Sequence, residues 1–232
     1  MSMENDYIRD NIEVILQRVE AAAHKSGRRA EDIKVIAVTK TVDENRILKA
    51  LENGLYDLGE NRVQELCDKY EKIDKRCNWH LIGHLQTNKV KYVADKVKMI
   101  HSLDRMELAL EIQKRAEKAG RIIEVLVQVN IAEEESKFGM EKKMVSDFLK
   151  EIGKFPNIKV KGLMTIAPLS QNSEEIRWVF TELRKLHIDI TQENIDNIDM
   201  DYLSMGMSND FEAAIEEGSN MVRIGTAIFG KR

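Results

Sequence analysis

The sequence predicts an α/β protein of the (β/α)8 TIM barrel class, with one additional helix before the first strand. Eight short β-type runs alternate with helix-length segments, which is the pattern of consecutive βα units. Several runs are apolar at successive positions, as expected for a parallel sheet that is buried on both faces. The first run lacks the glycine-rich turn that is typical of the alternative, an open doubly wound sheet. We therefore expect one barrel domain over residues 1–232.

The additional helix is predicted over residues 5–27. Apolar residues recur there at the three-and-four spacing of one helix face, namely Ile8, Ile12, Ile15, Leu16, Val19 and Ala23. Gly27 follows the last of them and is placed to end the helix. We interpret this segment as an amphipathic helix that covers one flank of the barrel core.

The eight strands and several helix ends follow from local patterns. The strands are predicted at 35–40, 57–61, 78–84, 99–104, 124–130, 160–167, 202–206 and 221–225. Two helices should begin at capping pairs, Thr41 with Glu44 and Asn172 with Glu175. Gly120 is expected to end the helix that follows the fourth strand.

Composition excludes several classes of protein. Hydrophobic residues make up 43% of the chain and charged residues 33%, so it is neither disordered nor fibrous. The net charge of -4 argues against a nucleic-acid partner. No apolar run reaches the roughly 18 residues that span a bilayer, and the acidic amino terminus is unlike a signal peptide. Cys67 and Cys77 alone form neither a disulfide framework nor a metal site, and we expect a cytoplasmic protein.

Lys40 is the most informative candidate for chemistry. In a (β/α)8 barrel, functional side chains lie at the carboxyl ends of the strands, where the loops converge on one mouth. Lys40 ends the first strand and shares a face with Ile36 and Val38, so it points into the mouth if these two point into the barrel. Desolvation there would favour a neutral amine, which can form a Schiff base with an aldehyde. Taken alone, the residue fits an ordinary solvent-exposed lysine equally well.

An anion site is predicted near the other end of the chain. The runs 202–206 and 221–225 are each followed by a short helical segment. The loops after strands seven and eight form the recurring phosphate site of this fold, because backbone N–H groups at helix starts attract a dianion. Ser208 and Thr226 add hydroxyl donors, and Gly225 permits close approach of the backbone.

Four further features are weaker candidates. His80 is expected to face the barrel interior, either near a ligand or as a hydrogen-bonded core residue, and roughly 13 Å of strand separates it from His84, too far to share a metal ion. Asn61 either contacts a ligand or caps the next helix. Met164 is expected to pack against whatever fills the mouth. The charged segment 133–139 is either a solvated loop or a lid on the functional rim.

An amine and an anion site at one barrel mouth suggest a ligand that carries both an aldehyde and a phosphate, namely pyridoxal 5'-phosphate (PLP). A specific combination of segments points the same way: AVTK at 37–40, GENRVQE at 59–65, WHLIGHLQ at 79–86, VN at 129–130, ESKFG at 135–139, GLM at 162–164, LSMGMS at 203–208 and VRIGT at 222–226. With them, the whole chain resembles the pyridoxal phosphate homeostasis protein family, whose barrel is related to the amino-terminal domain of alanine racemases.

The resemblance implies a PLP barrel of fold type III, in which Lys40 carries PLP as an internal aldimine. Ser208, Gly225 and Thr226 would hold the phosphate, and Arg223 would face the pyridine nitrogen. Because a guanidinium stays protonated, it would donate a hydrogen bond to the pyridine nitrogen without transferring a proton to it. The unprotonated ring would be a weak electron sink, which favours binding over carbanion chemistry. The predicted cofactor-binding residues are Lys40, Asn61, His80, Met164, Ser208, Arg223, Gly225 and Thr226.

Two functions fit these features, a protein of PLP homeostasis and a PLP-dependent amino-acid racemase. Racemisation needs two bases, and in alanine racemases the second is a tyrosine from a separate carboxyl-terminal β-domain of the partner subunit. The chain ends at Arg232, so we expect that domain to be absent, and none of the five tyrosines follows a predicted strand closely. We favour a monomeric, non-enzymatic PLP-binding protein with no nucleic-acid or membrane partner and with PLP-dependent apoenzymes as candidate recipients. Another phosphorylated metabolite paired with Lys40 is a third interpretation.

Overall fold

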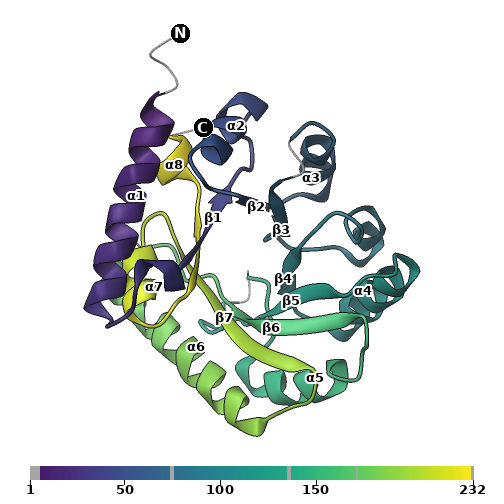
Figure 1. Ribbon diagram of the computed structural model, residues 1–232. Coiled ribbons are helices and arrows are strands. Elements are labelled where there is room, and N and C mark those ends of the chain that lie inside the picture. The colour runs from purple at the N-terminus through teal and green to yellow at the C-terminus, as the bar shows by residue number, and fades with distance from the viewer. Residues whose placement is uncertain (1–5, 74–75, 135–136, 171, 231–232) are drawn as a thin grey trace.

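The structure, a computed structural model, describes residues 6–73, 76–134, 137–170 and 172–230. Eight strands form a closed parallel barrel in the order β1-β2-β3-β4-β5-β6-β7-β8, and Figure 1 shows the helices arranged around its outside. The predicted (β/α)8 fold is therefore confirmed.

The elements follow the predicted alternation, with shifted ends. The strands are β1 (Lys34–Val38), β2 (Asp57–Glu60), β3 (Asn78–Leu81), β4 (Met99–Leu103), β5 (Ile123–Gln128), β6 (Ile158–Met164), β7 (Ile198–Met207) and β8 (Met221–Ile224). The α-helices are α1 (Asp6–Lys25), α2 (Glu44–Glu52), α3 (Val63–Tyr70), α4 (Met106–Lys118), α5 (Val145–Ile152), α6 (Ser173–Glu193), α7 (Phe211–Glu216) and α8 (Thr226–Phe229). Short 3-10 helices are η2 (Ala30–Asp32), η3 (Thr87–Tyr92) and η4 (Lys142–Met144).

The connection between β3 and β4 differs from the prediction. An α-helix was expected there, and the structure has the 3-10 helix η3 instead. Val90, Val93 and Val97 are buried in the connection, at spacings of three and four residues. β-branched side chains lose rotamer freedom in an α-helix. The short 3-10 helix contains Val90, and Val93 and Val97 follow it, yet all three side chains are still buried in the core.

The first and last strands close the barrel and fix what points inward. β1 pairs in parallel with β8, with Ile36 opposite Arg223. Ile36 belongs to an apolar cluster inside the barrel, together with Met99, Leu126, Met164 and Met221. This cluster is separate from the larger core between the strands and the helices. Arg223 therefore also points inward, and it is only 4% exposed.

Helix α1 confirms the predicted additional helix, although Asn5 lies outside the described residues. Its buried face includes Ile8, Ile12 and Ile15, and the helix packs against α7, α8 and α2 along one flank of the barrel (Figure 1). Gly27 adopts a positive φ of 72°, as expected where the helix ends. None of the described helices combines the length and the apolar character that a membrane span requires.

The other predicted helix-end signals have mixed outcomes. Gly120 follows α4 with a φ of 62°, as expected. Asn172 caps α6 by accepting a hydrogen bond from the Glu174 N–H, but its predicted partner Glu175 accepts from the Ser170 hydroxyl instead. Thr41 is not the cap of α2, because its own φ is 58° and the side chain of Asp43 takes the capping role. The left-handed turn at Thr41 lies directly after Lys40, and the Thr41 N–H in this turn donates to the side chain of Glu65.

Candidate functional site

A cavity of about 530 Å³ lies at the carboxyl ends of the strands. Its lining includes six of the predicted site residues, namely Lys40, Asn61, Ser208, Arg223, Gly225 and Thr226. They come from the segments that follow β1 and β2 and from the ends of β7 and β8 with their loops. The closure of β1 on β8 thus brings an amine from the start of the chain and polar groups from its end to one cavity.

Lys40 lies on the predicted face of the first strand. Ile36 is inside the barrel, and Val38 and Lys40 line the cavity above it, which is the expected alternation of two residues per layer. The lysine itself is half-buried. Its side chain therefore belongs to the cavity wall rather than to the outer surface of the barrel.

A buried ionic cluster supports the backbone on both sides of Lys40. The Nζ of Lys69 donates to Glu60 Oε1 at 2.7 Å, to Glu65 Oε1 at 2.7 Å and to the carbonyl of Thr39 at 2.6 Å. The Thr39 hydroxyl also donates to Glu60, and the Thr41 N–H donates to Glu65. Glu65 thereby holds the left-handed turn at Thr41, which a non-glycine residue adopts only at an energetic cost.

The charge of Glu65 is consistent with this role. Partial burial favours the neutral carboxyl, but the hydrogen bonds from Lys69 and from the Thr41 N–H outweigh it and hold the pKa of Glu65 below its ordinary value. The cluster was missed in the sequence because its three charged residues look like an ordinary solvated helix start, whereas Glu60 is fully buried.

A group of hydrogen-bond donors lies at the ends of β7 and β8, and β8 is the strand that pairs with β1. The backbone N–H groups of Gly225 and Ala227 both point at Ser208 Oγ, at 3.3 and 3.4 Å. Thr226 lies between them at the first position of α8 and lines the cavity. Two N–H groups and two hydroxyls therefore converge from two loops, and an anion with several oxygens can accept from all of them.

The loop that carries Ser208 is shaped by a glycine. Gly206 has a φ of 93°, and a Cβ there would lie 2.6 Å from the Cβ of Ala214 and 2.9 Å from the Cα of Phe211. Only glycine allows this conformation together with so close an approach of α7. The turn is closed by Asp210, whose carboxylate accepts from the Met207 N–H.

Arg223 supplies a buried positive charge at the cavity. Its Nη1 donates to Ser204 Oγ at 2.5 Å and its Nη2 donates to the carbonyl of Thr165 at 2.9 Å. Burial lowers the pKa of Arg223 to about 10, partly offset by the negative charge of Asp210. The guanidinium consequently stays protonated at neutral pH, in a fixed orientation.

His80 and Met164 do not line the cavity, contrary to the prediction. Both point into the barrel, but each lies one layer too deep, because side chains on one strand face advance by two residues per layer. The cavity is lined instead by Ile82 and Ile166, which follow them by two positions. Met164 is fully buried in the interior apolar cluster, and His80 is hydrogen-bonded to buried polar side chains.

The segment 133–139 reaches the cavity, although Glu135 and Ser136 lie outside the described residues. Phe138 lines the mouth, and its ring stacks on His84 with centroids 3.7 Å apart and an interplanar angle of 14°. Phe138 is 56% exposed and Leu169, on the same rim, is 95% exposed. Sequence reasoning identified the segment as a rim element but missed His84 and Leu169.

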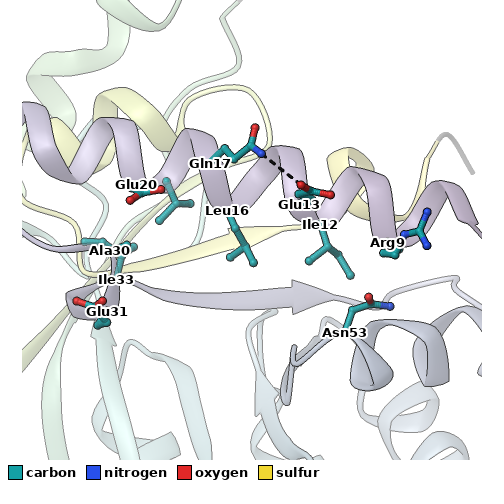
Figure 2. A pocket seen from close by; sticks show the side chains of 11 residues that line it. Arg9, Ile12, Glu13, Leu16, Gln17, Glu20, Ala30, Glu31, Ile33 and Asn53 are labelled. Carbon is teal, nitrogen blue, oxygen red and sulfur yellow. Dashed lines mark hydrogen bonds between the residues drawn. The ribbon is translucent and has the colours of Figure 1, made fainter.

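Figure 2 shows a second hollow, of about 620 Å³, on the flank of α1. It is lined by α1 residues such as Leu16 and Glu20 and by Glu31 and Ile33 of the segment that enters β1. It shares no lining residue with the cavity at the barrel mouth, and none of the predicted site residues lines it. We therefore assign the candidate functional site to the barrel mouth.

Comparison with known proteins agrees with this architecture. The family described as alanine racemase, N-terminal domain, matches residues 6–232. The pyridoxal phosphate homeostasis protein of Aquifex aeolicus is 47% identical over 219 residues, which cover 94% of this chain and 95% of that protein. The chain belongs to the pyridoxal phosphate homeostasis protein family. The protein of the same name from Escherichia coli K12 is 35% identical over 229 residues, with 97% of each chain covered.

Solved structures extend the comparison to three dimensions. The structure of PipY from Synechococcus elongatus with PLP bound has a TM-score of 0.84 and 28% identity, and the match covers 96% of this chain and 100% of that chain. An alanine racemase from Clostridium difficile has a TM-score of 0.75 at 18% identity, and only 57% of that chain is covered. That second likeness concerns the barrel fold alone.

Proposed function

We propose that this protein binds PLP at the barrel mouth and takes part in PLP homeostasis, with PLP held as a Schiff base on Lys40. The observation that carries the proposal is that Lys40, the anion-binding loops and Arg223 line one cavity. Its volume of about 530 Å³ is within the range of small-molecule sites. The names of the Aquifex aeolicus and Escherichia coli relatives and the PLP bound to PipY support the same ligand.

The donor set fits the chemistry of PLP. The nitrogen of Lys40 would bond to the aldehyde carbon while the aldehyde oxygen leaves as water. Ser208, Thr226 and the backbone N–H groups of Gly225 and Ala227 would hold the phosphate. When bound, PLP supplies an electrophilic carbon and an electron-withdrawing pyridine ring.

Arg223 favours a binding role over a racemase. We assign it to the pyridine nitrogen, where a protonated guanidinium donates a hydrogen bond and leaves the ring without a proton of its own. Racemisation would also need a second base opposite Lys40. None of the five tyrosines is among the residues that line the described cavity. His84 and Asp210 are the lining residues that could take this role in the alternative racemase.

The exposed rim bears on how PLP would leave. Phe138 and Leu169 present apolar surface around the mouth, next to the open end of the cavity. A recipient apoenzyme can approach such a rim without the barrel opening. We propose PLP-dependent apoenzymes as recipients and a monomer as the working form.

An absorbance titration with PLP tests the proposal. Wild type should develop a band of a protonated Schiff base, and Lys40→Ala should not. Lys98→Ala is the matched control, because Lys98 is an exposed lysine paired with Glu124 outside the cavity. A Lys40→Ala variant that develops the same band as wild type would refute the assignment. Conversion of L-amino acids to their D-forms by the wild type would support the racemase instead.

A further inference from the structure

A continuous chain of hydrogen bonds runs through the barrel interior below the cavity. It begins at Arg223, whose Nη1 donates to Ser204 Oγ at 2.5 Å. Ser204 Oγ is 3.2 Å from His101 Nδ1, and His101 Nε2 is 3.0 Å from His80 Nδ1. The chain ends where His80 Nε2 lies 2.9 Å from Asp57 Oδ1. It crosses the barrel from β8 through β7, β4 and β3 to β2.

The chemistry of the two ends gives this chain a single direction. Asp57 as a carboxylate can only accept, so the Nε2 of His80 carries a proton, and in a neutral imidazole the Nδ1 of His80 then accepts. His101 then donates through Nε2 and accepts at Nδ1, which leaves the hydroxyl proton of Ser204 as the donor. Arg223 can only donate, and the free lone pair of Ser204 receives its N–H. Every bond therefore points from the guanidinium to the carboxylate, with both imidazoles neutral.

Burial and charge are consistent with this assignment. Ser204 and His101 are fully buried, and His80 is 1% exposed. Burial is the main cause that lowers the pKa of His101 well below its usual range, so this imidazole is neutral at pH 7. Burial opposes the ionisation of Asp57, but its bond from His80 and the nearby charge of Lys34 hold the pKa of Asp57 below its ordinary value.

The far end of the chain is anchored at the base of the barrel. Asp57 is the first residue of β2, and Lys34 Nζ lies 3.4 Å from its Oδ2. Asn78 Nδ2 donates to its Oδ1 at 3.1 Å. Together with His80, these donors hold the Asp57 carboxylate in one orientation, so the last acceptor of the chain is fixed.

We propose that Ser204, His101 and His80 are positioning residues that orient the Arg223 guanidinium toward the ligand. The chain engages Nη1 and the carbonyl of Thr165 engages Nη2, while Arg223 itself lines the cavity. This inference rests on the proposed contact between Arg223 and the pyridine nitrogen. It adds that the orientation of the Arg223 guanidinium at that contact is set by a hydrogen-bond chain anchored at the opposite end of the barrel.

Nitrogen-15 NMR of the ligand-free protein tests the direction of the chain without PLP. We expect both His80 and His101 to be neutral and to carry the proton on Nε2 at pH 7, with His80→Asn and His101→Asn used to assign the signals. An Nδ1-protonated or doubly protonated ring at either position would overturn the proposal. This result does not depend on whether PLP binds.

A matched pair of buried serines tests the effect on the ligand. Ser204→Ala breaks the chain, and we expect roughly tenfold weaker binding of PLP and a shifted absorbance maximum. Ser219→Ala is the control, because Ser219 is equally buried but bonds only to the carbonyls of Leu203, Met205 and Met221. An unshifted spectrum and unchanged affinity in Ser204→Ala would contradict the proposal.

Arg223→Lys distinguishes the contact of Arg223 with the pyridine ring from the positioning chain behind Arg223. If this variant changes the PLP spectrum and Ser204→Ala and His101→Asn do not, the positioning chain is wrong and the proposed function stands. If Arg223→Lys also leaves spectrum and affinity unchanged, the contact of Arg223 with the ring is wrong. A graded loss, largest in Arg223→Lys and smaller in Ser204→Ala, supports both.

Discussion

Replacing Ser208 by alanine tests the anion site. Ser208 Oγ accepts from the N–H groups of Gly225 and Ala227 at 3.3 and 3.4 Å, which are long bonds, so those N–H groups remain available to an anion in the variant. What Ser208→Ala removes is the hydroxyl as a donor to the phosphate. A hydrogen bond to a charged group contributes about 1.5–3 kcal/mol, which corresponds to roughly 10- to 150-fold in Kd. Because the backbone donors stay, we expect the lower end, about tenfold.

The assay is a fluorescence or absorbance titration with PLP and, in parallel, with pyridoxal, which lacks the phosphate. Ser208→Ala should weaken the binding of PLP and leave the binding of pyridoxal unchanged, because only the phosphate of PLP accepts a hydrogen bond from the Ser208 hydroxyl. Ser146→Ala serves as the control, because Ser146 is a half-buried serine of α5 outside the cavity. An equal loss for PLP and pyridoxal would refute the assignment of Ser208 to the phosphate. An unchanged Kd for PLP would refute the role of the hydroxyl altogether.

Three further predictions concern the scaffold that supports the site. Lys69→Met leaves buried Glu60 without its cation, so the free energy of unfolding in a denaturant titration should fall by about 3–5 kcal/mol. Lys72→Met removes one partner of an exposed ion pair and should leave the free energy of unfolding nearly unchanged. Asp57→Asn should be less stable than wild type at neutral pH. The difference should begin to shrink as the pH falls through 3.8, where the unfolded carboxyl binds its proton, and should be smallest below the lowered pKa of native Asp57; a constant difference would contradict this. Gly206→Ala should cost about 3 kcal/mol or more in thermal unfolding, and a wild-type melting temperature would disprove the close approach of α7.

The barrel was predictable because its signals are local and repeated. Strand composition and the alternation with helices can be identified from consecutive residues of the sequence, and the face on which Lys40 lies follows from a period of two residues. His80 was expected to face the barrel interior and Met164 to pack at the mouth. Their depth was not predictable, because the height of the cavity floor depends on how eight strands are staggered around the barrel.

The interactions behind the site were harder to predict for a different reason. Lys69 and Glu60 form a buried pair between α3 and β2. His80 and His101 meet inside the barrel between the neighbouring strands β3 and β4. No spacing in the sequence distinguishes such residues from solvated lysines, glutamates and histidines. Their burial is a property of the closed barrel, and only the three-dimensional arrangement identifies their partners.

The most direct measurement of the central claim is peptide mapping after borohydride reduction of the protein incubated with PLP. If Lys40 holds PLP, one peptide containing a reduced phosphopyridoxyl-lysine at position 40 should dominate, and it should disappear in Lys40→Ala. Labelling spread over surface lysines, or the absence of any stable adduct at saturating PLP, would contradict it.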